Sequence, residues 1–191
     1  MPSDTTLLAF DTSAAHCAAA LVSGNRVIAT QVDQMSRGQA EHLMPMLDAF
    51  LTRHGVTWHD LTRIGVGVGP GNFTGIRISV SAARGVALGL GVPAIGVSAL
   101  DAIHRMRPDV TAAVAAPRDM IYVQAPGESA RIATAADVPD AVFATDPDAL
   151  IAAIASCAAD ADAAMSERPK PLYIKAADAA PSRDTAPVIL S

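Results

Sequence analysis

The spacing of apolar residues changes twice between positions 64 and 97, and the change predicts two strands joined by a helix. The short apolar run Ile64–Val68 is typical of a buried strand, and the glycines and proline at 69–71 end it. Apolar positions then recur every three or four residues, as on the buried side of a helix, until Gly91 and Pro93 stop the pattern before a second apolar run. We therefore predict a βαβ unit with parallel strands and a right-handed crossover.

Three shorter apolar segments precede this unit, at 6–11, 17–23 and 26–32. Only Gly24-Asn25 separates the second segment from the third, and such a two-residue turn joins antiparallel strands. We therefore expect the chain to begin as an antiparallel meander of three strands.

The other predicted elements are less regular, apart from a helix at 40–54 with one wide apolar stripe. Beyond the βαβ unit we expect the following: a short helix at 98–107, strands at 110–115 and 120–124, and an alanine-rich helix at 147–159. This order predicts an α/β protein with a larger lobe at 1–98 and a smaller lobe with a tail at 99–191.

Composition narrows the class of protein. Hydrophobic residues make up 51% of the chain and aromatic residues only 4%, so the core must consist mainly of Ala, Val, Leu and Ile. No apolar run reaches the roughly 18 residues of a membrane span, and the first residues lack a basic leader, so we expect a cytoplasmic protein without membrane contact. Cys17 and Cys157 lie far apart in apolar surroundings and are expected to be buried thiols.

A net charge of −5 argues against a broad surface for nucleic acid, although Arg77 and Arg84 could form a local basic patch. The five histidines form no His-x-x-x-His or His-Glu-x-x-His pair, and no Cys-x-x-Cys occurs, so no metal site is predicted. The Gly-x-Ser-x-Gly turn of serine hydrolases is also missing.

One candidate site is the polar turn Asp11, Thr12 and Ser13, which follows the first predicted strand. Its oxygen atoms could face a phosphate or a metal ion. They could equally hydrogen-bond the backbone of their own turn, and the spacing favours neither interpretation.

The second candidate site is the turn containing Gly69, Gly71, Thr74 and Gly75, where a strand gives way to a helix. Free backbone N–H groups at such a point can bind an anion. No Lys follows the glycines as in a Walker A motif, and the acidic partner of a dinucleotide-binding fingerprint is missing. The alternative is that the glycines only allow a tight turn and close packing of strand on helix.

Two predicted helices have apolar residues on more than one face, so part of their surface could serve for association rather than for packing on the sheet. The association hypothesis names eight residues: Leu43, Met46, Leu47, Phe50, Ile76, Val80, Ala83 and Ala87.

Three segments resemble a known family when they are taken together: LLAFDTSAAHCAAALV, GQAEHLMPML and GVGVGPGNFTGIRISVSAARGVALGLGVPAIGVSAL. They are similar to the TsaB (YeaZ) family of bacterial threonylcarbamoyladenosine biosynthesis proteins over roughly residues 5–105. The GPG-x-FTG-x-R core is shared with the catalytic paralogue TsaD and alone marks only the superfamily. The resemblance implies an actin/Hsp70-like (ASKHA, RNase H-like) fold with two lobes and mixed sheets flanked by helices.

The resemblance also implies a role. The chain would be a non-catalytic subunit that binds and activates a TsaD-like protein through the helices 42–50 and 76–90. It would need no cofactor, because ATP or ADP is expected with a TsaE-like ATPase and the metal ion with the TsaD-like partner. It would meet tRNA only through the complex and would pair as a homodimer when alone.

The catalytic paralogue has a His-x-x-x-His metal motif just after the strand that matches 94–97, and those two positions are Ala99 and Ile103 here. Neither side chain can bind a metal, so the resemblance favours the non-catalytic paralogue. Two enzymatic alternatives stay open: an M22-type peptidase, and a small ASKHA ATPase or kinase that uses Asp11 and the turn at 69–75.

Overall fold

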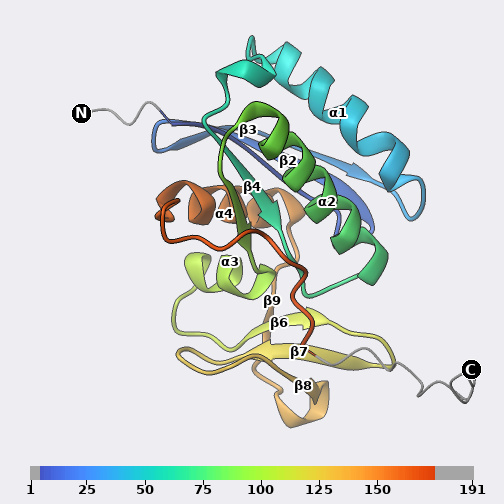
Figure 1. Ribbon diagram of the computed structural model, residues 1–191. Coiled ribbons are helices and arrows are strands. Elements are labelled where there is room, and N and C mark those ends of the chain that lie inside the picture. Colours follow the sequence, from blue (N-terminus) through green and yellow to red (C-terminus); the bar gives the residue numbers. More distant parts are fainter. Residues whose placement is uncertain (1–4, 175–191) are drawn as a thin grey trace, which may run out of the picture.

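The computed structural model describes residues 5–174, which form a larger and a smaller sheet with helices packed mainly around the larger one (Figure 1). The strands of the larger sheet are β1 (Thr6–Asp11), β2 (His16–Ser23), β3 (Arg26–Gln34), β4 (Arg63–Gly67) and β5 (Ala94–Val97). The strands of the smaller sheet are β6 (Ala112–Ala115), β7 (Met120–Gln124), β8 (Arg131–Thr134) and β9 (Val142–Phe143). The helices are α1 (Gln39–Arg53), α2 (Phe73–Leu90), α3 (Ala99–Met106) and α4 (Pro147–Asp160), with short 3₁₀ turns η1 (Trp58–Asp60) and η2 (Ala135–Asp137).

The larger sheet has the order β3-β2-β1-β4-β5, and it confirms the antiparallel meander and the parallel strands predicted for the first half of the chain. β1, β2 and β3 pair antiparallel as a meander, and β4 pairs parallel with both β1 and β5. The turn at Gly24 has φ of 61°, a left-handed conformation that glycine adopts without steric cost. Helix α2 joins the parallel strands β4 and β5 as the predicted crossover.

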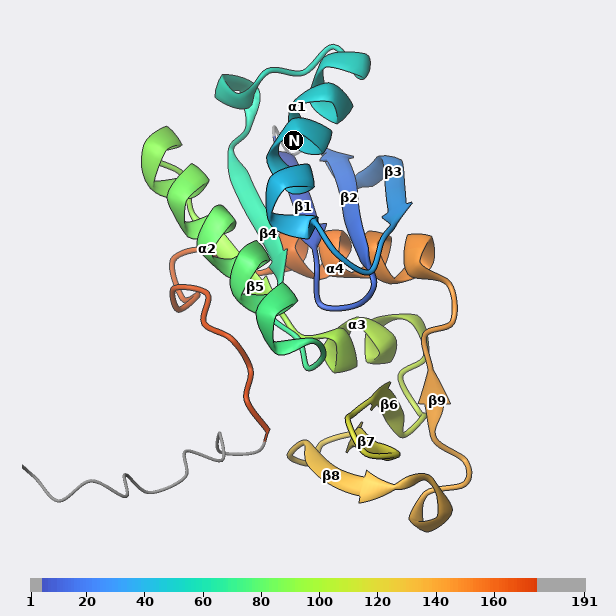
Figure 2. The ribbon, with the colours of Figure 1, turned by 90° about the vertical axis from the view of Figure 1, so that its right-hand side faces the viewer.

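Helices cover both faces of this sheet, α1 and α2 on one side and α4 on the other (Figures 1 and 2). The alternation of side chains along β1 divides its residues between the two layers. Leu8 and Phe10 pack with the α1 and α2 side chains, whereas Leu7 and Ala9 pack with those of α4. Because both faces are buried, the central strand is apolar throughout, as its sequence indicates.

The position of α4 changes the expected division at residues 98 and 99. This helix belongs to the second half of the chain, yet Ile151, Ile154 and Ala158 pack against the first sheet. The first lobe therefore consists of residues 5–97 together with α4, and only the segment between α3 and α4 forms a separate small lobe. The remainder of the expected second lobe, 175–191, lies outside the described residues.

The small lobe contains a sheet of order β8-β7-β6-β9, so a second sheet is confirmed, although β8 and β9 were not predicted. Its own buried cluster is limited to Ala113, Ile121, Val123 and Ala133 within the described part of the chain. Strands of two to five residues with so few buried side chains give weak periodicity, which explains why the sequence pattern missed two of them.

After α4 the chain runs back along the first lobe as a segment without helix or strand, residues 161–174, which we call the strap (Figure 2). The Leu172 N–H donates to the carbonyl of Val68 at 2.9 Å, and the buried Pro169 lies beside the exposed strand position Gly96. Arg63 anchors the start of the strap, because its Nη1 donates to the carbonyls of Ala158, Ala159 and Ala161 at 2.8 to 2.9 Å. Among the helices of residues 5–174, none has the length and apolarity that crossing a membrane requires.

Candidate functional site

The two polar turns singled out in the sequence meet at the C-terminal ends of β1 and β4. The Asn72 N–H donates to the carbonyl of Ser13 at 2.7 Å, and the Thr12 hydroxyl donates to the carbonyl of Gly75 at 2.6 Å. Parallel neighbouring strands explain the meeting, because their carboxyl ends reach the same edge of the sheet. The two turns, which were predicted separately, therefore form one structure.

Glycines make this contact possible. A Cβ at Gly75 would overlap the carbonyl oxygen of Thr12, and one at Gly71 would overlap that of Ser13. The first turn of α2 therefore sits on the backbone of the Asp11 turn with no room between them. Of the two interpretations of these glycines, close packing is the one that the geometry supports.

The Asp11 carboxylate is buried and used within its own turn. Its Oδ2 accepts from the Ser13 N–H at 3.1 Å and from the Ser13 hydroxyl at 2.9 Å, and it lies 3.2 Å from His16 Nε2. Its Oδ1 has no hydrogen-bond partner in the described chain, but a side chain at Gly67 would overlap this atom. Oδ1 is therefore packed against β4, and the turn offers no open carboxylate edge to a metal ion or phosphate.

Gln39, at the start of α1, binds the backbone of the same turn, and the sequence did not predict this contact. Its Nε2 donates to the carbonyls of Ala14 at 2.7 Å and His16 at 3.0 Å, with a longer contact to Thr12 at 3.4 Å. Sequence patterns give no indication of this, because the residues are more than twenty positions apart. Most polar groups of the turn are thus satisfied by the turn itself, by α2 or by Gln39, while Asp11 Oδ1 is packed without a partner among the described residues.

A cleft of about 670 Å³ lies beside these turns, between the first lobe and the small lobe. Ser13, His16, Gln39 and Asn72 contribute polar atoms to it, and most of its other lining is apolar. Its lining contains no Lys, Arg, Asp or Glu from the described residues. The cleft therefore offers a polyphosphate neither a cationic side chain nor a carboxylate that could hold a metal ion.

Ala99 and Ile103 line the same cleft from the start of α3. The family resemblance matches these two positions with the metal-binding histidines of the catalytic paralogue, and both are buried and apolar here. Within residues 5–174, no group of three or more His, Cys, Asp or Glu side chains is placed to hold a metal ion. The residues present therefore do not fit a metal centre of that type.

The eight residues proposed for association lie in the core, so their assignment to a surface is corrected. All are at most 5% exposed and pack between the helices and the first sheet: Leu43, Met46, Leu47, Phe50, Ile76, Val80, Ala83 and Ala87. An apolar stripe on a helix predicts the face that meets the sheet. The side of α1 and α2 that a binding partner could reach is therefore the opposite one.

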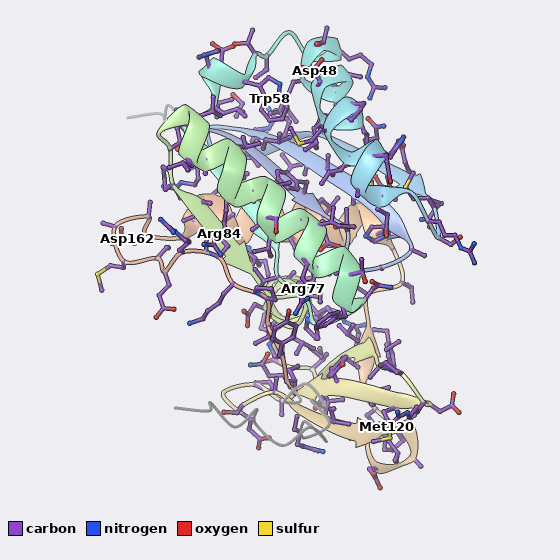
Figure 3. The ribbon with its side chains drawn as sticks, turned by 45° about the vertical axis from the view of Figure 1, so that its right-hand side comes forward. Asp48, Trp58, Arg77, Arg84, Met120 and Asp162 are labelled. Atoms are coloured by element: carbon purple, nitrogen blue, oxygen red, sulfur yellow. The ribbon has the colours of Figure 1, made fainter. Side chains whose placement is uncertain are left out.

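That opposite side forms what we call the outer surface, the exposed residues of α1 and α2 away from the sheet (Figure 1). Met44 is 38% exposed on α1, and Gly85 and Gly89 leave the α2 backbone open, because a Cβ added at either position would meet no atom within 4 Å. Asp48 of α1 accepts from Trp58 Nε1 at 3.0 Å and ties the 3₁₀ turn to the helix (Figure 3). The small residues permit close approach of another helix.

A second exposed cluster lies where α2 faces the strap. Phe73, Arg77 and Tyr173 pack on one another, with the Arg77 guanidinium 3.8 Å from the centre of the Phe73 ring. Thr74, by contrast, is exposed beside this cluster and takes no part in the contact between the turns. The sequence indicated Arg77, but it could not associate a helix residue with a tyrosine almost one hundred positions later.

Comparison with known proteins gives a family for this architecture. Residues 26–177 match the model of the family described as TsaD, tRNA N6-adenosine threonylcarbamoyltransferase. The tRNA threonylcarbamoyladenosine biosynthesis protein TsaB of Escherichia coli K12 is 38% identical over 94 residues, which cover 49% of this chain and 40% of that protein. The TsaB protein of Haemophilus influenzae is 32% identical over 124 residues, covering 61% of this chain and 52% of that one.

The chain thus spans about half the length of the curated relatives it matches. Among solved structures, YeaZ from Pseudomonas aeruginosa is 30% identical with a TM-score of 0.58, over 67% of this chain and 66% of that one. Another solved structure, described as an uncharacterized protein with similarity to peptidase YEAZ from Pseudomonas aeruginosa, has a TM-score of 0.70 at 24% identity, over 90% of this chain and 100% of that one. These likenesses confirm the expected two-lobed ASKHA-type fold.

Proposed function

Because this chain belongs to the TsaD family of tRNA N6-adenosine threonylcarbamoyltransferase proteins, we propose that it is a cytoplasmic, non-catalytic subunit of a tRNA threonylcarbamoyladenosine-modifying complex. In this role it binds and activates a TsaD-like catalytic subunit. A TsaE-like ATPase is a further partner, tRNA is met only through the complex, and two copies of this chain pair when the partner is missing.

The observation that carries the proposal is the identity of 32 to 38% to proteins named TsaB. The family model matches residues 26–177, which include α1 and α2. The proposal gives this chain no transferase activity of its own, because Ala99 and Ile103 cannot bind a metal ion and the two polar turns pack directly on each other.

Three features of the site support a non-catalytic role. The hydrogen-bonding groups of the Asp11 turn are largely satisfied by the protein itself. The cleft beside it is lined by no charged side chain of the described residues. Ala99 and Ile103 fill the positions of the paralogue's metal ligands.

The outer surface of α1 and α2 supports the partner-binding part of the proposal. Helices that pack side by side approach closely where glycine and alanine replace larger residues, and Gly85 and Gly89 lie one turn apart on α2. Met44 offers an adaptable apolar contact on the neighbouring helix. We propose this surface, rather than the eight buried residues, as the place where the TsaD-like subunit binds.

Co-purification tests the proposal. The full chain is expressed with the TsaD-like protein of its own organism, and the complex is sized by light scattering after gel filtration. A heterodimer that replaces a homodimer is the expected result. Failure to form any complex, with or without the ATPase and nucleotide, would contradict it.

Nucleotide titration of the isolated chain separates the proposal from its enzymatic rival. We expect no tight, Mg²⁺-dependent binding of ATP, because the cleft offers neither cations nor carboxylates to the phosphates. Tight binding would favour a small ATPase or kinase instead.

A further inference from the structure

The side of α2 that faces the strap carries two aromatic rings and an arginine in mutual contact. Phe73 is 47% exposed and Tyr173 is 45% exposed, and their ring centres are 5.5 Å apart. The Arg77 guanidinium lies over Phe73 at 3.8 Å, and its Nε donates to the Tyr173 hydroxyl at 2.9 Å. The guanidinium is thus fixed in orientation by a cation–π contact and a hydrogen bond.

The fixed guanidinium still has donors to offer. It carries five N–H groups, and only the one on Nε has a partner among residues 5–174. No carboxylate of the described chain lies within salt-bridge distance of Arg77. Its terminal nitrogens are therefore available to a planar or tetrahedral anion, which a guanidinium binds through two parallel hydrogen bonds.

Two more arginines, Arg84 of α2 and Arg168 of the strap, lie on this side of α2. We call the surface formed by Phe73, Arg77, Arg84, Arg168 and Tyr173 the strap flank. Arg84 lies two helical turns beyond Arg77, roughly 10 Å away along the axis, on the same edge of the helix (Figure 3). Arg84 and Arg168 of the strap line a cavity of about 600 Å³, and neither has an ion-pair partner in the described chain. The cavity also contains Ser166 and apolar residues of β5 and α2.

Acidic residues do not cancel this charge. Helix α2 contains no Asp or Glu. On the strap, Glu167 pairs with Lys170 at 2.6 Å, and Asp162 lies at the strap's start without an ion pair to Arg84. Three arginines on one flank that have no carboxylate partner among residues 5–174 stand out in a chain whose net charge is −5.

We propose that the strap flank binds a single-stranded segment of RNA. The half-exposed rings of Phe73 and Tyr173 stack on unpaired bases, Arg77 binds the adjoining phosphate, and Arg84 and Arg168 bind phosphates further along. Interleaved aromatic and cationic side chains are the chemistry with which proteins hold unpaired nucleotides. The inference deepens the proposed function, on which it rests, by giving this chain a direct contact to the substrate RNA.

The flank is distinct from the outer surface proposed for the protein partner. Gly89 opens the α2 backbone and does not line the cavity that holds Arg84 and Arg168, although Gly85 does, whereas Arg77 bonds a strap residue. The two surfaces can therefore be altered separately.

Binding of a short, fluorescein-labelled single-stranded RNA to the full chain tests the proposal by fluorescence anisotropy. The same RNA annealed to its complement is the second probe. The variants are the triple change Arg77→Ala, Arg84→Ala and Arg168→Ala, and the ring change Phe73→Leu. Arg26→Ala is the matched control, because Arg26 is exposed on β3, away from the flank.

Wild type is expected to prefer the single strand over the duplex. Phe73→Leu should weaken binding of the single strand about tenfold, since it removes a stacking ring and keeps an apolar side chain. The slope of log K against log salt should fall by about 0.7 for each arginine removed. The single variant Arg77→Lys keeps the charge but loses the planar guanidinium. It should keep the salt slope of wild type and bind the single strand more weakly than wild type.

Three results would overturn the proposal: no preference for the single strand, equal weakening by Arg26→Ala, or a triple variant that binds RNA as tightly as wild type. Assembly with the TsaD-like subunit is measured in parallel by light scattering. A triple variant that loses the subunit and keeps RNA binding would make the flank a protein contact instead. Loss of RNA binding with intact assembly supports the inference. If wild type binds the RNA but never the subunit, only the proposed function fails.

Discussion

The inner and outer faces of the layer formed by α1 and α2 differ in burial and in packing. On the inner face, Val80 and Ala83 are at most 3% exposed and pack on the first sheet. On the outer face, Leu88 of the same helix is 81% exposed and the Gly85 backbone is open. Apolar spacing therefore locates the core of such a helix, and the functional surface must be sought among the residues that break the spacing.

Glycine illustrates the difference within one helix. At Gly75 the missing side chain lets α2 rest on the backbone of Thr12, and at Gly85 it leaves an open surface. The same residue type thus serves the fold at one position and is free for recognition at the other. Substitutions that distinguish the two positions test this division.

The largest effect is expected from Val80→Glu, which places a charge in the core. Val80 is 3% exposed, and the described residues of its apolar cluster include no cation. An unpaired buried charge costs about 3–5 kcal/mol, a large part of the stability of an ordinary domain. Urea unfolding followed by circular dichroism should show this loss, and a folded variant of wild-type stability would contradict the burial of this face.

Smaller changes in the free energy of unfolding, opposite in sign, are expected when Gly75 and Gly85 are each replaced by alanine. Gly75→Ala should destabilise by about 1–3 kcal/mol, because its Cβ meets the Thr12 carbonyl. Gly85→Ala is the matched control and should stabilise by up to about 1 kcal/mol, since alanine is the better helix former and meets no neighbour. Equal shifts in thermal midpoint for both variants would argue against the close contact of the two turns.

The smallest effect concerns the two thiols. Burial raises the pKa of Cys17 to about 11, with a further contribution from Asp33 and Asp11, and burial also raises the pKa of Cys157. The native Cys17 thiol thus keeps its proton where the unfolded thiol loses it, so its contribution to stability is present below about pH 9 and is lost as the pH rises toward 11.

Alkylation with iodoacetamide at pH 8, followed by peptide mass spectrometry, compares how readily the two thiols react. Cys157 is only partly buried and should be modified first, whereas Cys17 lies fully buried beside Met35 and should stay unmodified until the protein unfolds. Faster modification of Cys17 would place it at the surface.

Local sequence patterns predicted the meander, the βαβ unit and the main helices, because each depends on spacing within one segment. They did not predict where α4 packs. This helix is apolar around much of its circumference, so its pattern does not distinguish a lobe of its own from the far face of the first sheet. They also missed β8 and β9, whose few residues bury too little to show a period.

The candidate site was predictable only in part, for a related reason. Both polar turns could be named, because glycine and hydroxyl residues mark turns at the ends of strands. Their contact with each other, and the hydrogen bonds of Gln39 to the first turn, depend on the arrangement of distant segments. The same is true of Tyr173, which the strap brings to Arg77.

Binding of the TsaD-like subunit to variants of the outer surface tests the central claim most directly. Gly85→Arg fills the open position on α2, and Ala136→Arg adds the same charge at an exposed position of the small lobe. Isothermal titration should show that Gly85→Arg weakens the complex at least tenfold while Ala136→Arg leaves its affinity unchanged. Equal affinity for both variants, with both folded, would contradict a partner site on the outer surface of α1 and α2.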